Sequence, residues 1–262
     1  MVSGAASLGF EVTLTAVPFV PVRDALVLAA GNGDRFHDGT RQSKLLQPIL
    51  GEPIILRTLA SVRAAGITHA EVVLGYQAVG LRAFIEAHTP SGLHLHFCYN
   101  PDWHLENGVS VLTARRRLAN RRFALLMGDH LFEAPVLTRL LAEPARPQES
   151  LLAVDSRSVA ADIAAEATKV RMSGDRIVAI GKDLERYDAL DTGMFVCSPR
   201  VFRALDRSRD RGDTTLSGGI RELAAEGLIR AVDIGPADWY DIDTVSDLQH
   251  AESLLGERAE SA

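Results

Sequence analysis

The sequence predicts an α/β fold in which a mainly parallel sheet is covered by helices. Short, continuous apolar runs at residues 25–29 and 123–127 are typical of strands that are buried on both faces. Between such runs, apolar residues recur at the spacing of amphipathic helices. Strands and helices alternate through the first half of the chain, and this order indicates crossover connections between parallel strands. With 262 residues and no linker or internal repeat, one domain with a full core is expected.

The first half of the chain contains the clearest pattern. The strand at 25–29 ends in glycines, and after a polar loop Pro53 opens a helix that Gly66 ends. Within that helix the apolar side chains of Ile55, Leu59 and Val62 recur at helical spacing. The remaining elements of this half are predicted as strands at 71–74, 93–99 and 123–127 and helices at 81–87 and 110–118.

The second half is less regular, and its strands have short or irregular connections. Residues 173–175, Ser-Gly-Asp, are a turn signal between two of these strands. Pro199 and Thr215 open two helices, and Thr244 with Asp247 three residues on is typical of a capping box. The expected strands lie at 151–154, 169–172, 177–180 and 194–197, and the final helix at 245–254.

The composition predicts a cytoplasmic protein. No apolar run approaches the roughly 20 residues that a membrane helix needs, so no membrane insertion is expected. Cys98 and Cys197 lie in apolar runs, which predicts free thiols in a reducing compartment. The first 22 residues lack the basic region of a signal peptide. We expect a loosely ordered extension at 1–22, a single domain at 23–256 and a tail at 257–262.

Charge and metal-ligand patterns exclude two other classes of function. A net charge of −6 argues against a general nucleic-acid-binding protein, which would carry a basic field. His94, His96 and Cys98 alternate along one predicted strand, but a zinc site wants four converging ligands, so an exposed strand face is favoured. A local arginine cluster is interpreted as a solvated helix end, with a phosphate-binding patch as the alternative; it comprises Arg115, Arg116, Arg117, Arg121 and Arg122.

A glycine loop follows the first buried strand. Glycine has no Cβ, so the backbone N–H groups around Gly31 and Gly33 can approach phosphate oxygens closely. A dinucleotide-binding fingerprint would need a third glycine near Phe36, and a P-loop would need a Gly-Lys-Ser/Thr sequence; neither occurs here. The alternative is a plain strand turn.

Two cations bracket this loop. Arg35 ends it, and Lys44 follows before the first predicted helix. Such a pair suits a triphosphate, whose departing pyrophosphate gains negative charge in the transition state. We therefore expect both cations on the pyrophosphate side of a bound nucleotide; for Lys44, an ordinary surface lysine is the alternative.

Three carboxylates are candidates for a magnesium site. Asp129 follows a buried strand through Gly128, so it should project from the carboxyl edge of the sheet, where such folds bind ligands. Asp241 and Asp243 share one face if their segment is extended. The alternatives are a helix cap at Asp129, for a helix from Pro135 onward, and two surface acids beside a cap.

These residues resemble the nucleotidyltransferases that act on sugar and polyol phosphates, the MobA-like NTP transferases, which share the Leu-Ala-Ala-Gly-x-Gly-x-Arg loop and its lysine. Within that group the sequence is most similar to the inositol-1-phosphate cytidylyltransferases, over about residues 25–251. The resemblance implies a Rossmann-like three-layer α/β/α nucleotidyltransferase fold with a mainly parallel mixed sheet. The segments that carry it lie at 28–35, 127–130, 166–169, 180–184, 191–193 and 195–196.

The resemblance also implies roles for single residues. Ser110 is in addition a plausible helix N-cap. Ser43 stands where the family usually has a proline, and Glu106 where it has a small residue. The implied catalytic residues are Arg35, Lys44 and Asp129, and Mg²⁺ is expected on Asp129, Asp241 and Asp243. The implied nucleotide-binding residues are Leu28, Ala29, Ala30, Gly31, Asn32, Gly33, Asn107 and Ser110, and the implied substrate-binding residues are Glu166, Thr168, Lys169, Lys182, Asp191 and Thr192.

The expected reaction is the transfer of a nucleotidyl group from an NTP, with CTP favoured, to a polyol phosphate such as inositol 1-phosphate. Its products would be a CDP-polyol and pyrophosphate. The alternatives are phosphocholine, another cyclitol phosphate or a hexose 1-phosphate as acceptor, and a catalytically silent nucleotide-sensing domain. In the inositol family the transferase is often fused to a membrane alcohol phosphotransferase. No such segment occurs in this sequence, so a separate membrane phosphotransferase is the expected partner.

Overall fold

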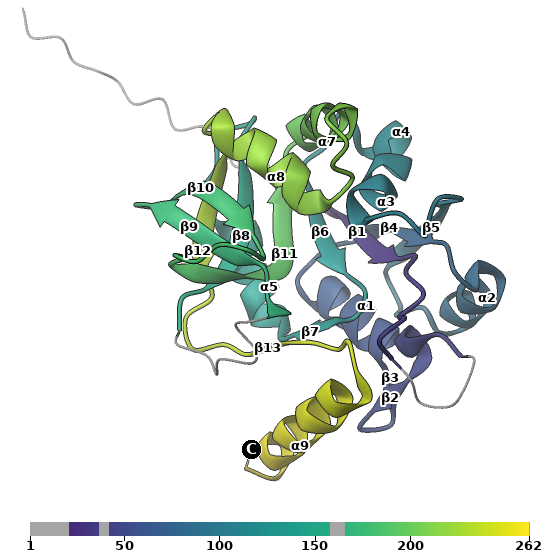
Figure 1. Cartoon of the computed structure of the whole chain (residues 1–262). Helices are drawn as coiled ribbons and strands as arrows, with labels where there is room; N and C mark the ends of the chain where they lie inside the picture. The colour runs from purple at the N-terminus through teal and green to yellow at the C-terminus, as the bar shows by residue number, and fades with distance from the viewer. Residues whose placement is uncertain (1–20, 37–41, 158–165, 262) are drawn as a thin grey trace, which may run out of the picture.

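The computed structural model describes residues 21–36, 42–157 and 166–261. Strands of these segments form a central mixed sheet, with smaller two-stranded ribbons beside it (Figure 1). In spatial order the sheet consists of β5 (His94–Tyr99), β4 (His69–Leu74), β1 (Asp24–Ala29), β6 (Phe123–Met127), β11 (Ala189–Cys197), β8 (Ser150–Asp155), β12 (Ile229–Asp233), β10 (Arg176–Gly181) and β9 (Lys169–Ser173).

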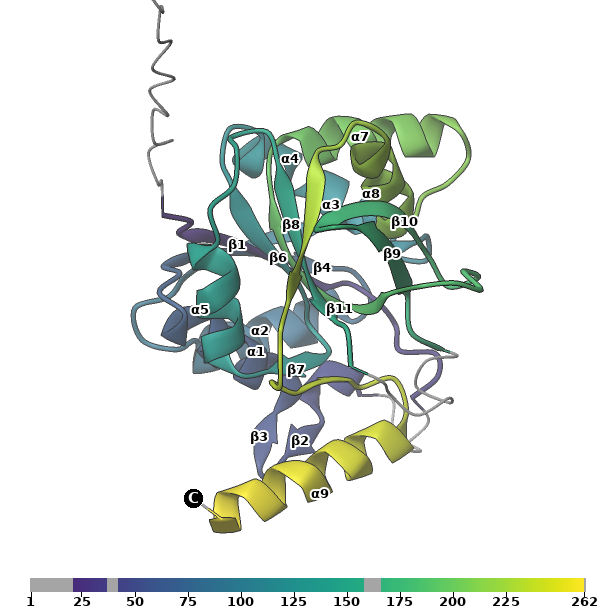
Figure 2. The same cartoon turned by 90° about the vertical axis from the view of Figure 1, so that its left-hand side faces the viewer.

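The two halves of this sheet differ in strand direction. In the first half β5, β4, β1 and β6 are all parallel, with Asp24 of β1 opposite both His69 and Phe123. In the second half only β8 and β12 are parallel to each other. β11 runs antiparallel to β6 and β8, and it also pairs with β9. The strands β8, β12, β10, β9 and β11 therefore pair around a small closed ring (Figure 2).

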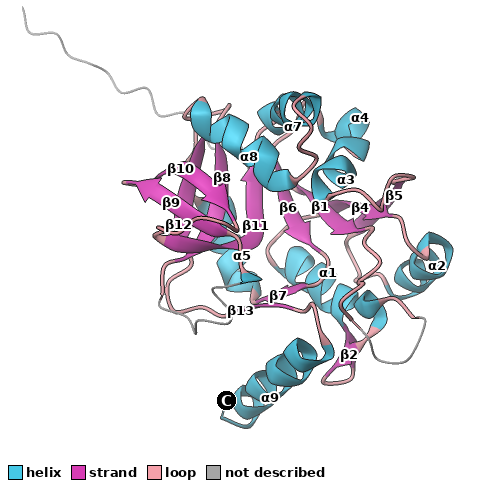
Figure 3. Ribbon diagram, viewed as in Figure 1, coloured by secondary structure: helices cyan, strands magenta, loops and turns pink. Residues whose placement is uncertain are grey.

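Helices cover both faces of the sheet, which confirms the predicted three-layer α/β/α fold (Figure 3). Along β1 the side chains of Ala25 and Val27 pack on one face and those of Leu26 and Leu28 on the other, and all are buried. The first face packs against α1 (Ile54–Ala64), α2 (Ala78–His88) and α5 (Ala134–Ala142), and the second against α3 (Asn107–Thr113), α4 (Arg115–Leu118), α7 (Arg200–Asp210) and α8 (Leu216–Ala225).

Short elements outside the sheet shape the edge where its parallel strands end. A 3₁₀ turn, η1 (Lys44–Leu46), lies between the glycine loop and the ribbon of β2 (Pro48–Ile49) and β3 (Glu52–Pro53). A second antiparallel ribbon pairs β7 (His130–Phe132) with β13 (Trp239–Asp241). The final helix α9 (Val245–Ser261) follows β13 and lies outside the layers, against β13 and β2 (Figure 2).

Most predicted elements are present, and the differences have physical causes. α3 begins at Asn107, so Ser110 lies inside the helix and its predicted role as N-cap was wrong. β11 begins at Ala189, before the predicted start at 194, and it is irregular there, since Gly193 has a positive φ and the register shifts between Asp191 and Phe195. α9 continues past the predicted end at 254 to Ser261, since one glycine at 256 costs a helix only about 1 kcal/mol. The proposed extension falls largely outside the described residues.

Several residues singled out in the sequence form the turns and helix caps expected of them, and Asp129 does not act as a cap. The turn at Gly174, the Thr215 cap and the Thr244–Asp247 capping box all form as predicted. Asp129 does not cap α5, whose N-cap position is Glu133. Among the described helices, none is long and apolar enough to span a bilayer.

Candidate active site

The candidate site is a cleft of about 860 Å³ where β1 and β6 of the parallel half meet β8 and β11 of the mixed half. The β7–β13 ribbon and the first turns of α9 complete its wall. Many of the residues singled out in the sequence line it: Leu28, Ala30, Gly31, Arg35, Asn107, Ser110, Asp129, Glu166, Thr168, Lys182, Asp191, Asp241 and Asp243.

The glycine loop allows the lysine to pass close beneath it. Gly33 has a φ of +65°, and a Cβ at this position would lie 3.2 Å from the Cγ and Cδ atoms of Lys44. A larger residue would therefore be strained by its backbone and crowd the lysine stem. η1 then holds Lys44 with its side chain 10% exposed and its amine directed to the cleft acids.

Lys44 bridges two of the three predicted metal ligands. Its Nζ lies 2.7 Å from Oδ2 of Asp129 and 2.9 Å from Oδ1 of Asp243. Burial lowers the pKa of Lys44, but the two carboxylates raise it by more, so the pKa lies above its ordinary value and the amine is charged. Arg35 also contacts Asp243, and its Nη1 lies 3.5 Å from Oε2 of Glu166. Both predicted cations thus contact the acids directly.

Asp241 and Asp243 reach Asp129 because the β7–β13 ribbon joins distant parts of the chain. In the ribbon Asp241 pairs with His130, and the N–H of Ile242 donates to the carbonyl of Asp129 at 3.2 Å. Beyond β13, the carboxylate of Asp247 accepts hydrogen bonds from the N–H groups of Asp243 and Thr244, at 3.1 and 2.7 Å. The capping box of α9 therefore fixes the backbone that carries Asp243.

His130 belongs to this cluster, although the sequence analysis assigned it no role. Its Nδ1 lies 2.9 Å from the carbonyl oxygen of Thr192, and its Nε2 lies 3.3 Å from Asp241 and 4.0 Å from Asp129. Burial lowers the pKa of His130, but Asp241 and then Asp129 raise it to about 10, which makes the ring cationic. A Cβ at Gly193 would lie 2.3 Å from Nδ1, so only glycine leaves room for the ring.

The donor set favours a hard divalent cation. Asp129, His130 and Asp241 each offer one ligand atom within 4.8 Å of the others. Carboxylate oxygens are the ligands that Mg²⁺ prefers, so Asp129 and Asp241 are the donors of this group that suit it best. Asp129 and Asp243 already share one positive charge, the amine of Lys44. Two of the three predicted ligands, Asp129 and Asp241, thus belong to a group that suits a divalent cation, whereas Asp243 is not part of that group and is linked to Asp129 through Lys44.

The substrate end of the cleft contains four of the six predicted residues. Asp191 lies there, and burial raises its pKa to about 6 although the N–H of Gly193 donates to it at 2.8 Å. The other two residues point elsewhere. Thr192 is fully buried and its hydroxyl donates to the carbonyl of Ala153 at 2.8 Å. Lys169 donates to the carbonyl of Lys182 at 2.7 Å. These bonds leave Thr192 and Lys169 supporting the wall rather than lining it.

Polar side chains and an aromatic residue from other segments also line the cleft. The side-chain oxygen of Asn107 accepts from the N–H of Leu216 at 2.8 Å, and the hydroxyl of Ser110 accepts from Asn100 at 3.0 Å. Trp103 lines the cleft with them, and its ring centroid lies 5.4 Å from that of Tyr76. Trp103 was missed because it stands in a loop without a periodic pattern.

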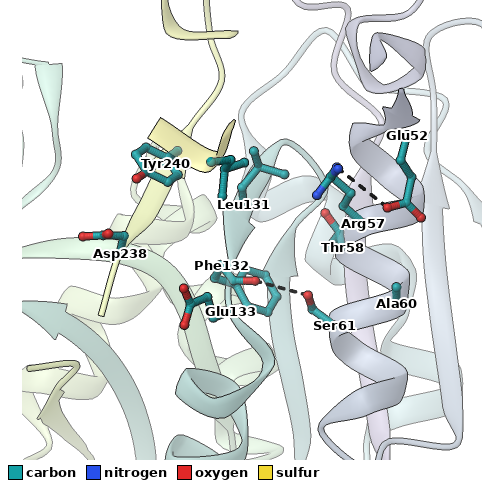
Figure 4. Close-up of a pocket in the computed structure, with 11 residues that line it drawn as sticks. Glu52, Arg57, Thr58, Ala60, Ser61, Leu131, Phe132, Glu133, Asp238 and Tyr240 are labelled. Atoms are coloured by element: carbon teal, nitrogen blue, oxygen red, sulfur yellow. Dashed lines mark hydrogen bonds and ion pairs between the residues drawn. The ribbon is translucent and has the colours of Figure 1, made fainter. Parts of the chain in front are cut away.

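A smaller cavity of about 240 Å³ lies beside the β7–β13 ribbon, between it and α1 (Figure 4). Arg57, Ser61 and Tyr240 are among its lining residues. None of the residues predicted to bind nucleotide, substrate or metal lines it, so the larger cleft is the candidate active site.

Two other patterns have local explanations. Arg115 pairs with Asp206, Arg117 with Glu71 and Arg121 with Asp24, so these arginines contact acids of the protein itself. Along β5, His94 and His96 are exposed, and the thiol of Cys98 donates to Glu71 at 3.5 Å. Both cysteines, Cys98 and Cys197, are free thiols.

The fold of the described residues is that of the nucleotidyltransferase class. The chain belongs to the MobA-like NTP transferase domain family, whose sequence pattern matches residues 25–226.

The chain is similar to two proteins whose activities are named. The chain is 36% identical over 234 residues to a bifunctional IPC transferase and DIPP synthase of Rubrobacter xylanophilus, covering 88% of this chain and 51% of the relative. It is 30% identical over 254 residues to a CMP-5'-(3-aminopropyl)phosphonate synthase of Streptomyces rubellomurinus, covering 89% of this chain and 38% of that one. The chain thus spans about half the length, or less, of these relatives.

A solved structure agrees with this assignment. The inositol-1-phosphate CTP transferase of T. maritima has a TM-score of 0.77 and 25% identity to this chain, with 90% of this chain and 96% of that chain covered. This likeness confirms the Rossmann-like mixed α/β fold expected from the sequence.

Proposed function

We propose that this protein transfers CMP from CTP to a polyol phosphate of the inositol 1-phosphate type, in a Mg²⁺-dependent reaction that gives a CDP-polyol and pyrophosphate. The observation that carries the proposal is the bridge from Lys44 to Asp129 and Asp243 directly beneath the glycine loop. A fixed cation and an acid pair at the carboxyl edge of the sheet, where open α/β folds bind ligands, support this proposal. The names of the Rubrobacter relative and of the T. maritima structure support the acceptor and CTP.

The chemistry needs no general base. A phosphate monoester is largely dianionic at neutral pH, so one of its oxygens can attack the α-phosphorus directly, with pyrophosphate leaving in line. The protein supplies positioning and charge neutralisation. Mg²⁺ bound to Asp129, Asp241 and Asp243 would neutralise phosphate charge. Lys44 and Arg35 carry the positive charges that stabilise the departing pyrophosphate.

The substrate end of the cleft suits a polyhydroxylated phosphate. Lys182 offers a cation for the phosphate, while Glu166, Thr168 and Asp191 offer hydrogen-bonding groups for ring hydroxyls. Trp103, Asn107 and Ser110, which also line the cleft, are the proposed nucleoside contacts. The CDP-linked product would then be a substrate for a membrane alcohol phosphotransferase.

The test is pyrophosphate release with Mg²⁺, screened across the four common nucleoside triphosphates and a panel of acceptors. The panel contains inositol 1-phosphate, phosphocholine, another cyclitol phosphate, a hexose 1-phosphate and, because of the Streptomyces relative, an aminoalkyl phosphonate. The expected result is release only with CTP and a cyclitol phosphate, together with a CDP-linked product by mass spectrometry. Turnover of another acceptor changes the substrate assignment. No turnover of any pair, while CTP still binds, would establish a nucleotide-sensing domain instead.

A further inference from the structure

At the end of β8, in the wall of the cleft, Asp155 and Arg157 form a hydrogen-bonded pair, the arginine–aspartate clasp. Asp155 is 2% exposed. Its Oδ1 accepts from the backbone N–H and the Nε of Arg157, both at 2.9 Å, and its Oδ2 accepts from the Nη2 of Arg157 at 2.7 Å. The indole Nε1 of Trp239 donates to the same Oδ2 at 3.1 Å. One carboxylate therefore holds a neighbouring arginine and a tryptophan from far along the chain.

The contacts of Arg157 extend the clasp toward the same distant segment. Its Nη1 lies 3.2 Å from both the carbonyl oxygen of Pro236 and the Oδ1 of Asp238. The guanidinium is thus engaged through Nε, Nη1 and Nη2 within the protein, and both oxygens of Asp155 are occupied. Although burial raises the pKa of Asp155, these hydrogen bonds lower it below its ordinary value. A pair satisfied in this way is suited to hold structure rather than to bind a ligand.

The segment that the clasp holds is the one that delivers a metal ligand. Trp239 starts β13, and Asp241 ends it. β13 has only three residues paired with β7, so its own ladder anchors it weakly. The Trp239 ring lies 6.0 Å from the ring of His130, which contacts Asp241. The next residue, Tyr240, lines the smaller cavity beside the ribbon (Figure 4).

We propose that Asp155 and Arg157 are positioning residues, which hold Trp239 and thereby keep Asp241 beside Asp129 for binding of the divalent cation. The cation itself rests on the proposed function. The hold on β13 does not, because it follows from the contacts of Asp155, Arg157 and Trp239 alone. Residues around metal ligands commonly change metal affinity by about 10- to 100-fold when they are replaced.

The chain contains a matched control at the other end of β8. Glu149 immediately precedes the strand, is 3% exposed, and accepts from the Nε of Arg230 at 3.1 Å. Like Asp155, it is a buried acid held by an arginine, but it does not line the cleft. E149Q therefore reports the cost of losing a buried charge next to β8 without altering the clasp.

The experiment compares D155N, W239F and E149Q with the unchanged protein. Hydrogen exchange of the peptide covering residues 239–243 reports the hold on β13, and Mn²⁺ titration followed by electron paramagnetic resonance reports the metal site. We expect D155N to speed exchange in that peptide and to weaken Mn²⁺ binding about tenfold. W239F keeps an aromatic ring near His130 and loses only the indole donor, so a smaller change in the same direction is expected. E149Q should leave both quantities within about twofold.

Each failure has its own meaning. If D155N and W239F exchange like the unchanged protein, or if E149Q loosens residues 239–243 equally, the clasp does not position β13. If the variants loosen β13 but bind Mn²⁺ normally, the positioning of Asp241 for the cation is wrong. If the unchanged protein binds no Mn²⁺ and releases no pyrophosphate, the proposed function fails, while hydrogen exchange still decides the hold on β13. Should D155N not fold, W239F carries the test.

Discussion

The two halves of the cleft are built differently. In the parallel half, functional groups stand at or just beyond strand ends: the glycine loop after β1 and Asp129 after β6. In the mixed half, Asp241 comes from a three-residue strand that lies outside the central sheet. Strand ends in a buried parallel sheet are rigid, whereas a short ribbon depends on contacts from elsewhere. Nucleotide binding should therefore tolerate changes to the ribbon, and metal binding should not.

Removing the charges where the halves meet should have the largest effect. Lys44→Ala and Asp129→Asn each break the bridge beneath the glycine loop, and loss of one such electrostatic group typically costs about 10²- to 10³-fold in turnover. The measurement is pyrophosphate release at saturating CTP and acceptor, with circular dichroism to verify folding. Arg116→Ala, at an exposed position on α4, is the control. Near-normal turnover in either cleft variant would contradict the assignment.

Substitution of two glycines should affect the two halves of the cleft separately. A Cβ at Gly193 would lie 2.3 Å from the Nδ1 of His130, and a Cβ at Gly75 would lie 2.3 Å from the Cβ of Trp103. We expect Gly193→Ala to raise the Mg²⁺ concentration needed for half-maximal activity, and Gly75→Ala to raise the KM for CTP. Crowding of this kind costs about 1–3 kcal/mol, which corresponds to roughly 5- to 150-fold in the affected constant. Equal effects of both variants on both constants would remove the distinction.

Two helix caps provide a comparison of moderate size. Thr215 caps α8, where its hydroxyl accepts from the N–H of Gly218 at 2.9 Å, and Thr244 belongs to the capping box beside Asp243. Loss of either cap should lower the free energy of unfolding by about 1 kcal/mol. Thr244→Ala should in addition reduce turnover, because Asp243 then loses a fixed backbone. Urea unfolding and steady-state kinetics measure the two effects; if Thr215→Ala reduces turnover as much, the special role of the α9 cap is wrong.

The smallest expected effect concerns a thiol outside the cleft. Burial, and then the charge of Glu71, raise the pKa of Cys98 to about 11, so the reactive thiolate is scarce at pH 8. Alkylation by iodoacetamide should therefore be slow at pH 8 and accelerate up to about pH 11. Glu71→Gln removes the smaller cause and should speed alkylation at pH 8 by several-fold, without changing turnover. An alkylation rate that levels off near pH 8.5 would show an ordinary thiol.

The sequence predicted those parts of the molecule that have local causes. The buried strands β1 and β6 follow from their apolar runs, and Asp129 follows from its place after β6. Alternation predicted a common face for Asp241 and Asp243 if their segment is extended, but β13 ends at Asp241. Asp243 is linked to Asp129 through Lys44, and Asp241 is linked to it through His130. The assigned catalytic and binding roles themselves stay predictions until the variants are measured.

The remaining parts depend on contacts that no local pattern contains. Asp155 and Trp239 meet only because the chain folds β13 back beside β8, so neither residue had a recognisable partner in the sequence. β7 and β13 have three residues each, too few for a periodic signal. The sequence predicted a role for Lys44 beside the pyrophosphate but not its contacts with Asp129 and Asp243, which form where its stem passes close to the open backbone of Gly33.

The closed ring of strands in the mixed half has a consequence for association between chains. Because β9 turns back to pair with β11, the central sheet has one complete unpaired edge among its described strands, that of β5. An unpaired edge is where a strand from another molecule can add. Along β5 the side chains of His94 and His96 are exposed, so polar side chains border the edge, among the described strands, through which copies of this chain could extend each other's sheets.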